Sequence, residues 1–248
     1  MTDVNVSLPP ALRRALDLLA DPPADPDVSK GYLDLLGAGS APDDAVRHDN
    51  TGLVQAAWGS PIGSMLYDNA QAFLRRRLTG WRPPVEWLNI PPGGTALDVG
   101  SGPGNVTAAL GRAAGPDGLA LGIDISEPML ARAVRNEAGP HVGFIRADAQ
   151  RLPLRDDTVD ALVSIAVLQL VPAPAAALGE MARVLRPGGR LAILVPSAGR
   201  ITQLLPKVNG RVFGFDDDVV GDVLEKSGFV GVRVKNFATF QWVRGING

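Results

Sequence analysis

A glycine-rich turn is the segment of this sequence with the clearest chemical meaning. Residues 98–105 read DVGSGPGN, after a short apolar run and before a helical pattern. Glycine lets the chain turn sharply and lets a ligand approach the backbone, and the start of the following helix offers free N–H donors to an anionic group. A strand, a glycine-rich turn and a helix predict a nucleotide-like ligand at the carboxyl end of a sheet. Two glycines alone would equally fit a tight connection without a ligand.

An acidic residue downstream strengthens the ligand interpretation. Asp124 ends the next predicted strand, 22 residues after Gly102 (124 − 102). A carboxylate at this place can accept hydrogen bonds from both hydroxyls of a ribose. Ser126 and Pro128 then start another helix, as an N-cap and a first-turn proline do. Together these residues predict a nucleoside site.

The details of the turn decide which nucleotide fits. A dinucleotide fingerprint, G-x-G-x-x-G, needs a third glycine where this chain has Asn105. Asp98, two positions before the first glycine, would also lie unfavourably beside a pyrophosphate. S-adenosylmethionine carries an adenosine, a positive sulfonium, an amine and a carboxylate but no phosphate. We therefore expect S-adenosylmethionine as the cofactor, ahead of a nicotinamide dinucleotide.

Four segments resemble, in order and spacing, the motifs of class I S-adenosylmethionine-dependent methyltransferases: ALDVGSGPGN, LGIDISEPML, FIRADAQRLPLRDDTVDALVS and MARVLRPGGRLAI. The resemblance covers about residues 94–197, with a weaker similarity in FDDDVVGDVLEKSGFVGVRV. It is strongest to the small-molecule branch that includes ubiquinone/menaquinone-biosynthesis methyltransferases.

The resemblance implies a set of cofactor-binding residues at three strand ends. The turn would line the methionine and adenosyl part through Asp98, Gly100, Ser101, Gly102 and Gly104, with Asn105 completing the motif. Asp124 would bind the ribose hydroxyls, with Ile125 and Met129 against the adenine. Asp148 would accept from the exocyclic amine of the adenine, beside Ala149. Ser164 and Ile165 would end the fourth strand beside the transferable methyl. Met129 would also fit a core position, and Asp148 a turn before Gln150.

The same stretch excludes several methyltransferase subclasses. A (D/N/S)PPY tetrapeptide, expected for methylation of an adenine or glutamine amino group, is missing after the fourth strand. Cytosine C5 methylation needs a cysteine nucleophile, and the chain has no cysteine. Metal-dependent catechol-type enzymes have an acidic residue where this chain reads Val163-Ser164-Ile165. A small-molecule acceptor remains, and the large apolar side chains of residues 53–67 favour an apolar or aromatic one, although a sugar hydroxyl stays open.

Few residues qualify as the general base for O- or C-methylation. His48 has a suitable pKa range, but its surroundings fit an exposed loop better than a catalytic role. Tyr67 and Asp68 are further candidates, and Tyr67 would also fit a role in closing the pocket. His141, directly before a predicted strand, reads as structural. Alignment alone supplies roughly 7–11 kcal/mol in favourable intramolecular reactions, so a strong base is helpful rather than obligatory.

Alternating apolar runs and helical patterns predict an α/β fold: a Rossmann-like, mostly parallel seven-stranded sheet with helices on both faces and a helical N-terminal cap. The expected strands are 96–99, 119–125, 142–147, 161–165, 190–195, 231–237 and 240–244. Short helices are expected at 8–20 and 31–36, and a longer one at 64–78. Two further helices should bury Val106, Ala109, Leu110 and Ala113, and Leu178, Met181, Ala182 and Leu185.

We divide the chain into a cap or lid, residues 1–93, and a cofactor-binding domain, residues 94–248. Glycines and apolar residues between about 40 and 80 suggest that the cap moves on ligand binding. Across the 248 residues, 24 Lys and Arg balance 26 Asp and Glu, and only two histidines occur. We therefore expect a small-molecule partner and no nucleic acid, metal or stable membrane insertion.

The N-terminus lacks a signal-peptide pattern, which predicts a cytoplasmic protein. The oligomeric state stays open. A non-catalytic S-adenosylmethionine-binding regulatory module, and a nicotinamide-dependent oxidoreductase, are the alternative functions.

Overall fold

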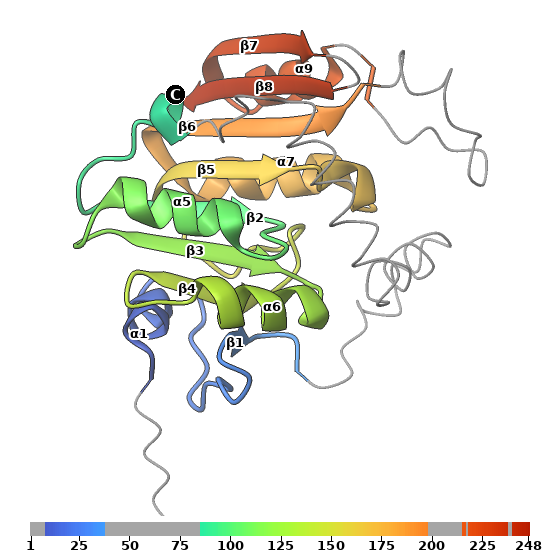
Figure 1. The fold of residues 1–248 in the computed structure, drawn as a ribbon. Helices are drawn as coiled ribbons and strands as arrows, with labels where there is room; N and C mark the ends of the chain where they lie inside the picture. Colours follow the sequence, from blue (N-terminus) through green and yellow to red (C-terminus); the bar gives the residue numbers. More distant parts are fainter. Residues whose placement is uncertain (1–7, 38–84, 198–214, 217, 238–239) are drawn as a thin grey trace, which may run out of the picture.

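A central sheet of eight strands organises the part of the chain that the computed structural model describes, which is residues 8–37, 85–197, 215–216, 218–237 and 240–248 (Figure 1). The strands are β1 (Leu33–Asp34), β2 (Thr95–Val99), β3 (Leu119–Asp124), β4 (Val142–Arg146), β5 (Val159–Ile165), β6 (Leu185–Pro196), β7 (Phe229–Phe237) and β8 (Phe240–Asn247). Their order is β1-β4-β3-β2-β5-β6-β8-β7. All neighbours are parallel except β6–β8 and β8–β7.

This order places a ligand site at one edge of the sheet. From β2 the chain builds outward through β3 and β4, and then returns to the other side of β2 with β5 and β6. The point at which the strand order reverses is therefore at β2 and β5. In open sheets of this kind, ligands bind beside the carboxyl ends of the strands at such a switch point.

Helices cover both faces of the sheet (Figure 1). One face packs against α1 (Pro10–Leu16), α7 (Pro174–Val184) and α9 (Val219–Lys226). The other packs against α4 (Val85–Leu88), α5 (Asn105–Ala114) and α6 (Glu127–Glu137). Side chains alternate along each strand, so Leu97 and Val99 face the first group, whereas Ala96 faces the second. The expected Rossmann-like, mostly parallel architecture is confirmed.

The N-terminal segment differs from its prediction. The expected helix at 31–36 is wrong, because Leu33 and Asp34 form β1, which pairs in parallel with β4. The sheet consequently has eight strands rather than seven. Helix α1 covers only Pro10–Leu16 of the expected 8–20, and its Ala11, Leu12 and Ala15 belong to the main core. Residues 10–35 thus pack on the sheet through α1 and pair with it through β1. The domain boundary between residues 93 and 94, and the movement of the lid, stay predictions.

The buried faces predicted for helices α5 and α7 are partly wrong. In α5 the buried residues are Thr107, Ala108, Leu110, Gly111 and Ala114, whereas Ala113 is exposed. The spacing of large apolar residues could not predict this buried face, because it includes Thr107 and Gly111. Helix α7 does bury Leu178 and Met181, but it ends at Val184, and Leu185 already belongs to β6. The helix expected at 64–78 lies outside the described residues.

Candidate functional site

The glycine turn between β2 and α5 has a backbone that only glycine adopts readily. Gly100, Gly102 and Gly104 have φ angles of +77°, +50° and +84°, in the left-handed region that a side chain disfavours. A Cβ atom at Gly100 would overlap the Val167 side chain, and one at Gly104 would lie 2.7 Å from Phe144 Cζ. The turn therefore packs directly on Val167, which follows β5, and on Phe144 of β4. This packing leaves no room for side chains at Gly100 and Gly104.

Asp124, at the end of β3, holds this turn in place. Its Oδ2 accepts a hydrogen bond from the Gly102 N–H at 2.8 Å, and its Oδ1 accepts one from the Ser126 N–H at 2.8 Å. Burial raises the pKa of this carboxyl, while the N–H groups of Ser126 and Gly102 act in the opposite direction. The residue is half-buried, and each carboxylate oxygen has a second lone pair for a ligand hydroxyl.

A second carboxylate, Asp98, is buried on the α5 face of β2. Its Oδ2 accepts a hydrogen bond from the Thr107 hydroxyl at 2.7 Å, which ties the first turn of α5 to the strand. Burial raises the pKa of Asp98 to about 7, and the negative charge of Asp124 adds to this effect, while the Thr107 hydrogen bond opposes it. A cation bound beside Asp98 would favour its ionised form.

Ser101, in the middle of the turn, carries a polar atom without a partner. The residue is buried, and its Oγ has no hydrogen-bond partner among the described residues. Leaving a buried hydroxyl unpaired costs free energy, and native structures contain few such groups. A ligand polar atom at this turn would satisfy it.

The remaining predicted cofactor residues lie at the same edge of the sheet. Asn105, exposed, begins α5, half-buried Ile125 follows β3, and Met129 is buried in α6. Their roles at a cofactor stay predictions.

Asp148 and Ser164 already have partners within the chain. Asp148 Oδ1 accepts the Gln150 N–H at 2.9 Å, and the Gln150 amide also reaches both carboxylate oxygens. This is the turn that the sequence allowed as its alternative role. The Ser164 hydroxyl donates to the Val99 carbonyl at 3.0 Å and so links β5 to β2. Ala149 and Ile165 are half-buried beside them. Contacts of these four residues with a cofactor stay predictions.

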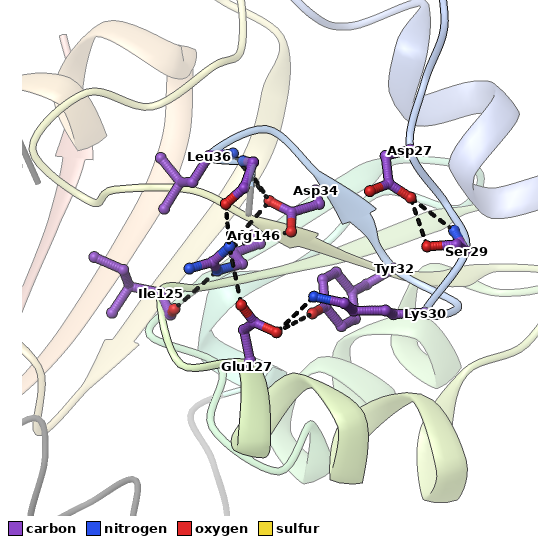
Figure 2. Close-up of polar contacts among 10 residues, drawn as sticks. Asp27, Ser29, Lys30, Tyr32, Asp34, Leu36, Ile125, Glu127 and Arg146 are labelled. Atoms are coloured by element: carbon purple, nitrogen blue, oxygen red, sulfur yellow. Dashed lines mark hydrogen bonds and ion pairs between the residues drawn. The ribbon is translucent and has the colours of Figure 1, made fainter. Parts of the chain in front are cut away.

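Sequence reasoning missed a buried charged cluster around Arg146, which lies beside Ile125 and Glu127 (Figure 2). Arg146, the last residue of β4, has a side chain only 10% exposed and pairs with Asp34 of β1 at 3.1 Å and with Glu127 of α6 at 3.2 Å. The signal in the sequence was a charged residue, Arg146, within the strand predicted at 142–147. The partner segment, however, is 112 residues away along the chain.

The candidate bases lie elsewhere. His48, Tyr67 and Asp68 are outside the described residues. His141 directly precedes β4, and its buried Nδ1 has no hydrogen-bond partner in the described part of the chain. Within the described ranges no cluster of His, Cys, Asp and Glu suits a metal ion, and no helix there is long and apolar enough to cross a membrane.

Comparisons with known proteins agree with this geometry. Residues 97–193 match the family model described as a methyltransferase domain. Over 116 residues the chain is 40% identical to a demethylmenaquinone methyltransferase of Roseiflexus castenholzii, covering 46% of this chain and 48% of the relative. It is 43% identical over 156 residues to an uncharacterised 37.1 kDa protein of a Streptomyces fradiae transposon, covering 62% and 44%.

A solved structure gives a similar result. The S-adenosylmethionine-dependent methyltransferase of Aquifex aeolicus superposes with a TM-score of 0.55 at 25% identity, covering 66% of this chain and 87% of that one. The chain spans about half, or less, of the length of the two curated relatives. The family model spans residues 97–193, from β2 to β6, and so includes the glycine turn and Asp124.

Proposed function

We propose that this chain carries a class I S-adenosylmethionine-dependent methyltransferase domain, which its similarity to the methyltransferase-domain family and to known methyltransferases supports, and that it transfers a methyl group to a small apolar or aromatic acceptor. The transfer is an in-line displacement at an oxygen or a carbon. The observation that carries the proposal is the hydrogen bond between the Gly102 N–H and Asp124. It brings the turn and the acid together, as a nucleoside site requires, and the turn lacks the third glycine of a dinucleotide fingerprint.

The chain's own residues divide the work of binding. Asp124 would hold the ribose hydroxyls with its free lone pairs, and Ser101 Oγ would gain the partner that it lacks. Asp98 would favour the positive end of the cofactor, because a carboxylate of raised pKa becomes ionised beside a cation. When bound, S-adenosylmethionine supplies a methyl group on a sulfonium leaving group. Orienting the acceptor against that methyl and excluding water then lower the barrier.

The acceptor would be a reduced quinone or a similar aromatic compound. The demethylmenaquinone methyltransferase relative supports this class, as do the large apolar side chains at 53–67. An acceptor hydroxyl or acidic carbon forms the new bond to the methyl carbon while the carbon–sulfur bond breaks, and the acceptor's proton passes to a base or to water. His48 and Tyr67 are our candidates for that base. The balanced charge of the chain supports a small molecule rather than nucleic acid.

A transfer assay tests the proposal. The protein is incubated with S-adenosylmethionine labelled in its methyl group and with a short-chain reduced demethylnaphthoquinone, a phenol or neither, and labelled products are identified by mass spectrometry. We expect methylated product from an aromatic acceptor. Asp124→Ala should weaken binding of S-adenosylhomocysteine by about 1–3 kcal/mol, because charge-assisted hydrogen bonds are lost. Asp117→Ala, in the loop before β3, is the matched control and should leave binding unchanged.

Other results would support the alternative functions. Tight binding of S-adenosylhomocysteine with no transfer to any acceptor would favour a regulatory module. Binding of NAD in place of S-adenosylhomocysteine, measured by calorimetry, would favour an oxidoreductase.

A further inference from the structure

The buried Arg146 guanidinium joins three separate segments at the carboxyl edge of the sheet (Figure 2). Its Nη1 donates to Asp34 Oδ2 of β1 at 3.1 Å and to the Gly37 carbonyl at 2.9 Å. Its Nε donates to the Ile125 carbonyl at 3.3 Å. Because Ile125 directly follows Asp124, one side chain connects the N-terminal segment to the loop that carries the predicted ribose ligand.

Glu127 extends this connection on the outer side of the loop. One of its oxygens lies 3.2 Å from Arg146, and the other accepts from Lys30 Nζ at 2.6 Å and from the Tyr32 hydroxyl at 3.4 Å. Tyr32 is itself buried against Phe144, the residue that packs against the glycine turn at Gly104. Residues 30–37 therefore contact the cofactor edge by two routes, one polar and one apolar.

The cluster fixes the backbone on both sides of Ser126. Arg146 holds the Ile125 carbonyl before it and the Glu127 carboxylate after it, while the Ser126 N–H donates to Asp124 Oδ1. The orientation of the Asp124 carboxylate depends on this backbone. Asp34 and Glu127 already neutralise the guanidinium, so Arg146 has no need of a ligand anion. It acts through the loop rather than through contact with a ligand.

We propose that Arg146 is a positioning residue for the cofactor site, and that with Asp34 and Glu127 it orients Asp124 toward the ribose. This inference rests on the proposed function. Lysine cannot replace arginine in this role, because a single ammonium nitrogen in the place of Nη1, which meets Asp34, Gly37 and Glu127, cannot also make the bond of Nε to the Ile125 carbonyl.

Calorimetric titration with S-adenosylhomocysteine tests the role. We expect Arg146→Lys, which keeps the buried charge, to weaken affinity about tenfold, because the Ile125 contact is lost. Arg183→Lys is the matched control: Arg183 bonds the Leu152 and Leu154 carbonyls and pairs with Glu180 and Asp156. Arg183→Lys should lower the stability, measured by thermal unfolding, about as much as Arg146→Lys does. It should change the affinity for S-adenosylhomocysteine less than about twofold.

A double-mutant cycle separates positioning from a general loss of structure. In an Asp124→Ala background, Arg146→Lys should change affinity less than about twofold, because the group that Arg146 orients is gone. If Arg146→Lys does not fold, Glu127→Gln at the half-exposed outer position takes its place in the same cycle, with an expected weakening of about threefold.

Wild-type affinity in the folded variant, or the same loss in both backgrounds, would overturn the positioning role, while binding by the wild-type protein would leave the proposed cofactor site standing. Failure of the wild-type protein to bind S-adenosylhomocysteine would overturn both.

Discussion

The two edges of the parallel strands place their charges differently. At the carboxyl ends of β4 and β1, the paired Arg146 and Asp34 side chains are only 10% and 3% exposed. At the amino ends, Arg186 pairs with Asp160 at 2.6 Å, but the Arg186 side chain is 46% exposed. Arg14 similarly donates from α1 to the Gly118 and Asp117 carbonyls in the loop before β3. Both edges use arginines to join segments, but only one buries them.

This difference supports the proposal that the carboxyl edge is the functional one. Removing charges from water costs free energy that an ion pair only partly recovers. The carboxyl edge adds a turn with three left-handed glycines and the unpaired Ser101 hydroxyl. Features that break local rules concentrate at functional sites, where their cost is tolerated. At the amino edge the arginines are more exposed, and their contacts join β6 to β5 and α1 to the loop before β3.

Removing one partner of the buried pair should give the largest effect. Asp34→Ala removes the buried partner of Arg146, leaves only the half-exposed Glu127 to balance its charge, and frees the Leu36 and Gly37 N–H groups, so we expect a loss of about 3–5 kcal/mol in unfolding free energy. Asp156→Ala is the matched change at the amino edge, where the Asp156 side chain is 72% exposed; it should cost less than about 1 kcal/mol. Urea denaturation measures both, and equal losses would remove the contrast between the edges.

A pair of glycines compares the backbones of the two edges. Gly100→Ala should cost about 2–4 kcal/mol, because its φ is +77° and the new methyl group would overlap Val167. Gly115→Ala, at the opposite end of α5, has a φ of +81° but nothing within 4 Å of the added Cβ. It should cost about 1 kcal/mol. Thermal unfolding of both variants gives the difference, and a similar cost at the two positions would show that Gly100 is not a site of close packing.

The smallest effect is a pH dependence that originates at Asp98. Its pKa is raised by burial to about 7, above the unfolded value, so the folded state retains a proton that the unfolded state has released. Between about pH 4 and 7, this group lowers stability as the pH rises, and above pH 7 its contribution is constant. Binding of the S-adenosylmethionine cation should release that proton, and affinity should fall up to about tenfold for each pH unit below 7.

Calorimetry at pH 6, 7 and 8, in buffers of different ionisation enthalpy, measures the proton released. Asp98→Asn should bind with no proton release and with little change across this range. The same pH dependence in the variant would assign it to another group.

The sequence predicted the parts of the fold that follow local patterns. The seven long strands, the turn at 98–105 and the placement of Asp124 at the end of a strand all follow from apolar runs and glycine spacing. The two-residue strand β1 has no periodicity of its own, since Leu33 and Asp34 become a strand only by pairing with β4. The phase of α5 depends on the hydrogen bond between Thr107 and Asp98, which no hydrophobic pattern contains.

The Arg146 cluster was beyond sequence reasoning for a similar reason. Arg146 looks like any charged residue near a strand end, and Asp34 lies in a segment that was expected to be helical. Only the tertiary pairing of β1 with β4 brings the two charges to 3.1 Å. By contrast, the spacing of Gly102 and Asp124 predicts their contact, because the two residues lie at the carboxyl ends of adjacent parallel strands, β2 and β3.

Hydrogen–deuterium exchange with and without S-adenosylhomocysteine tests most directly whether the carboxyl edge is the cofactor site. We expect ligand protection in peptides that cover residues 98–105 and 122–130, where the glycine turn and the Asp124 loop lie. Peptides that cover 114–119 and 186–190, at the amino edge, should exchange at unchanged rates. Protection at the amino edge, or none at residues 98–105 and 122–130 under saturating ligand, would contradict the account.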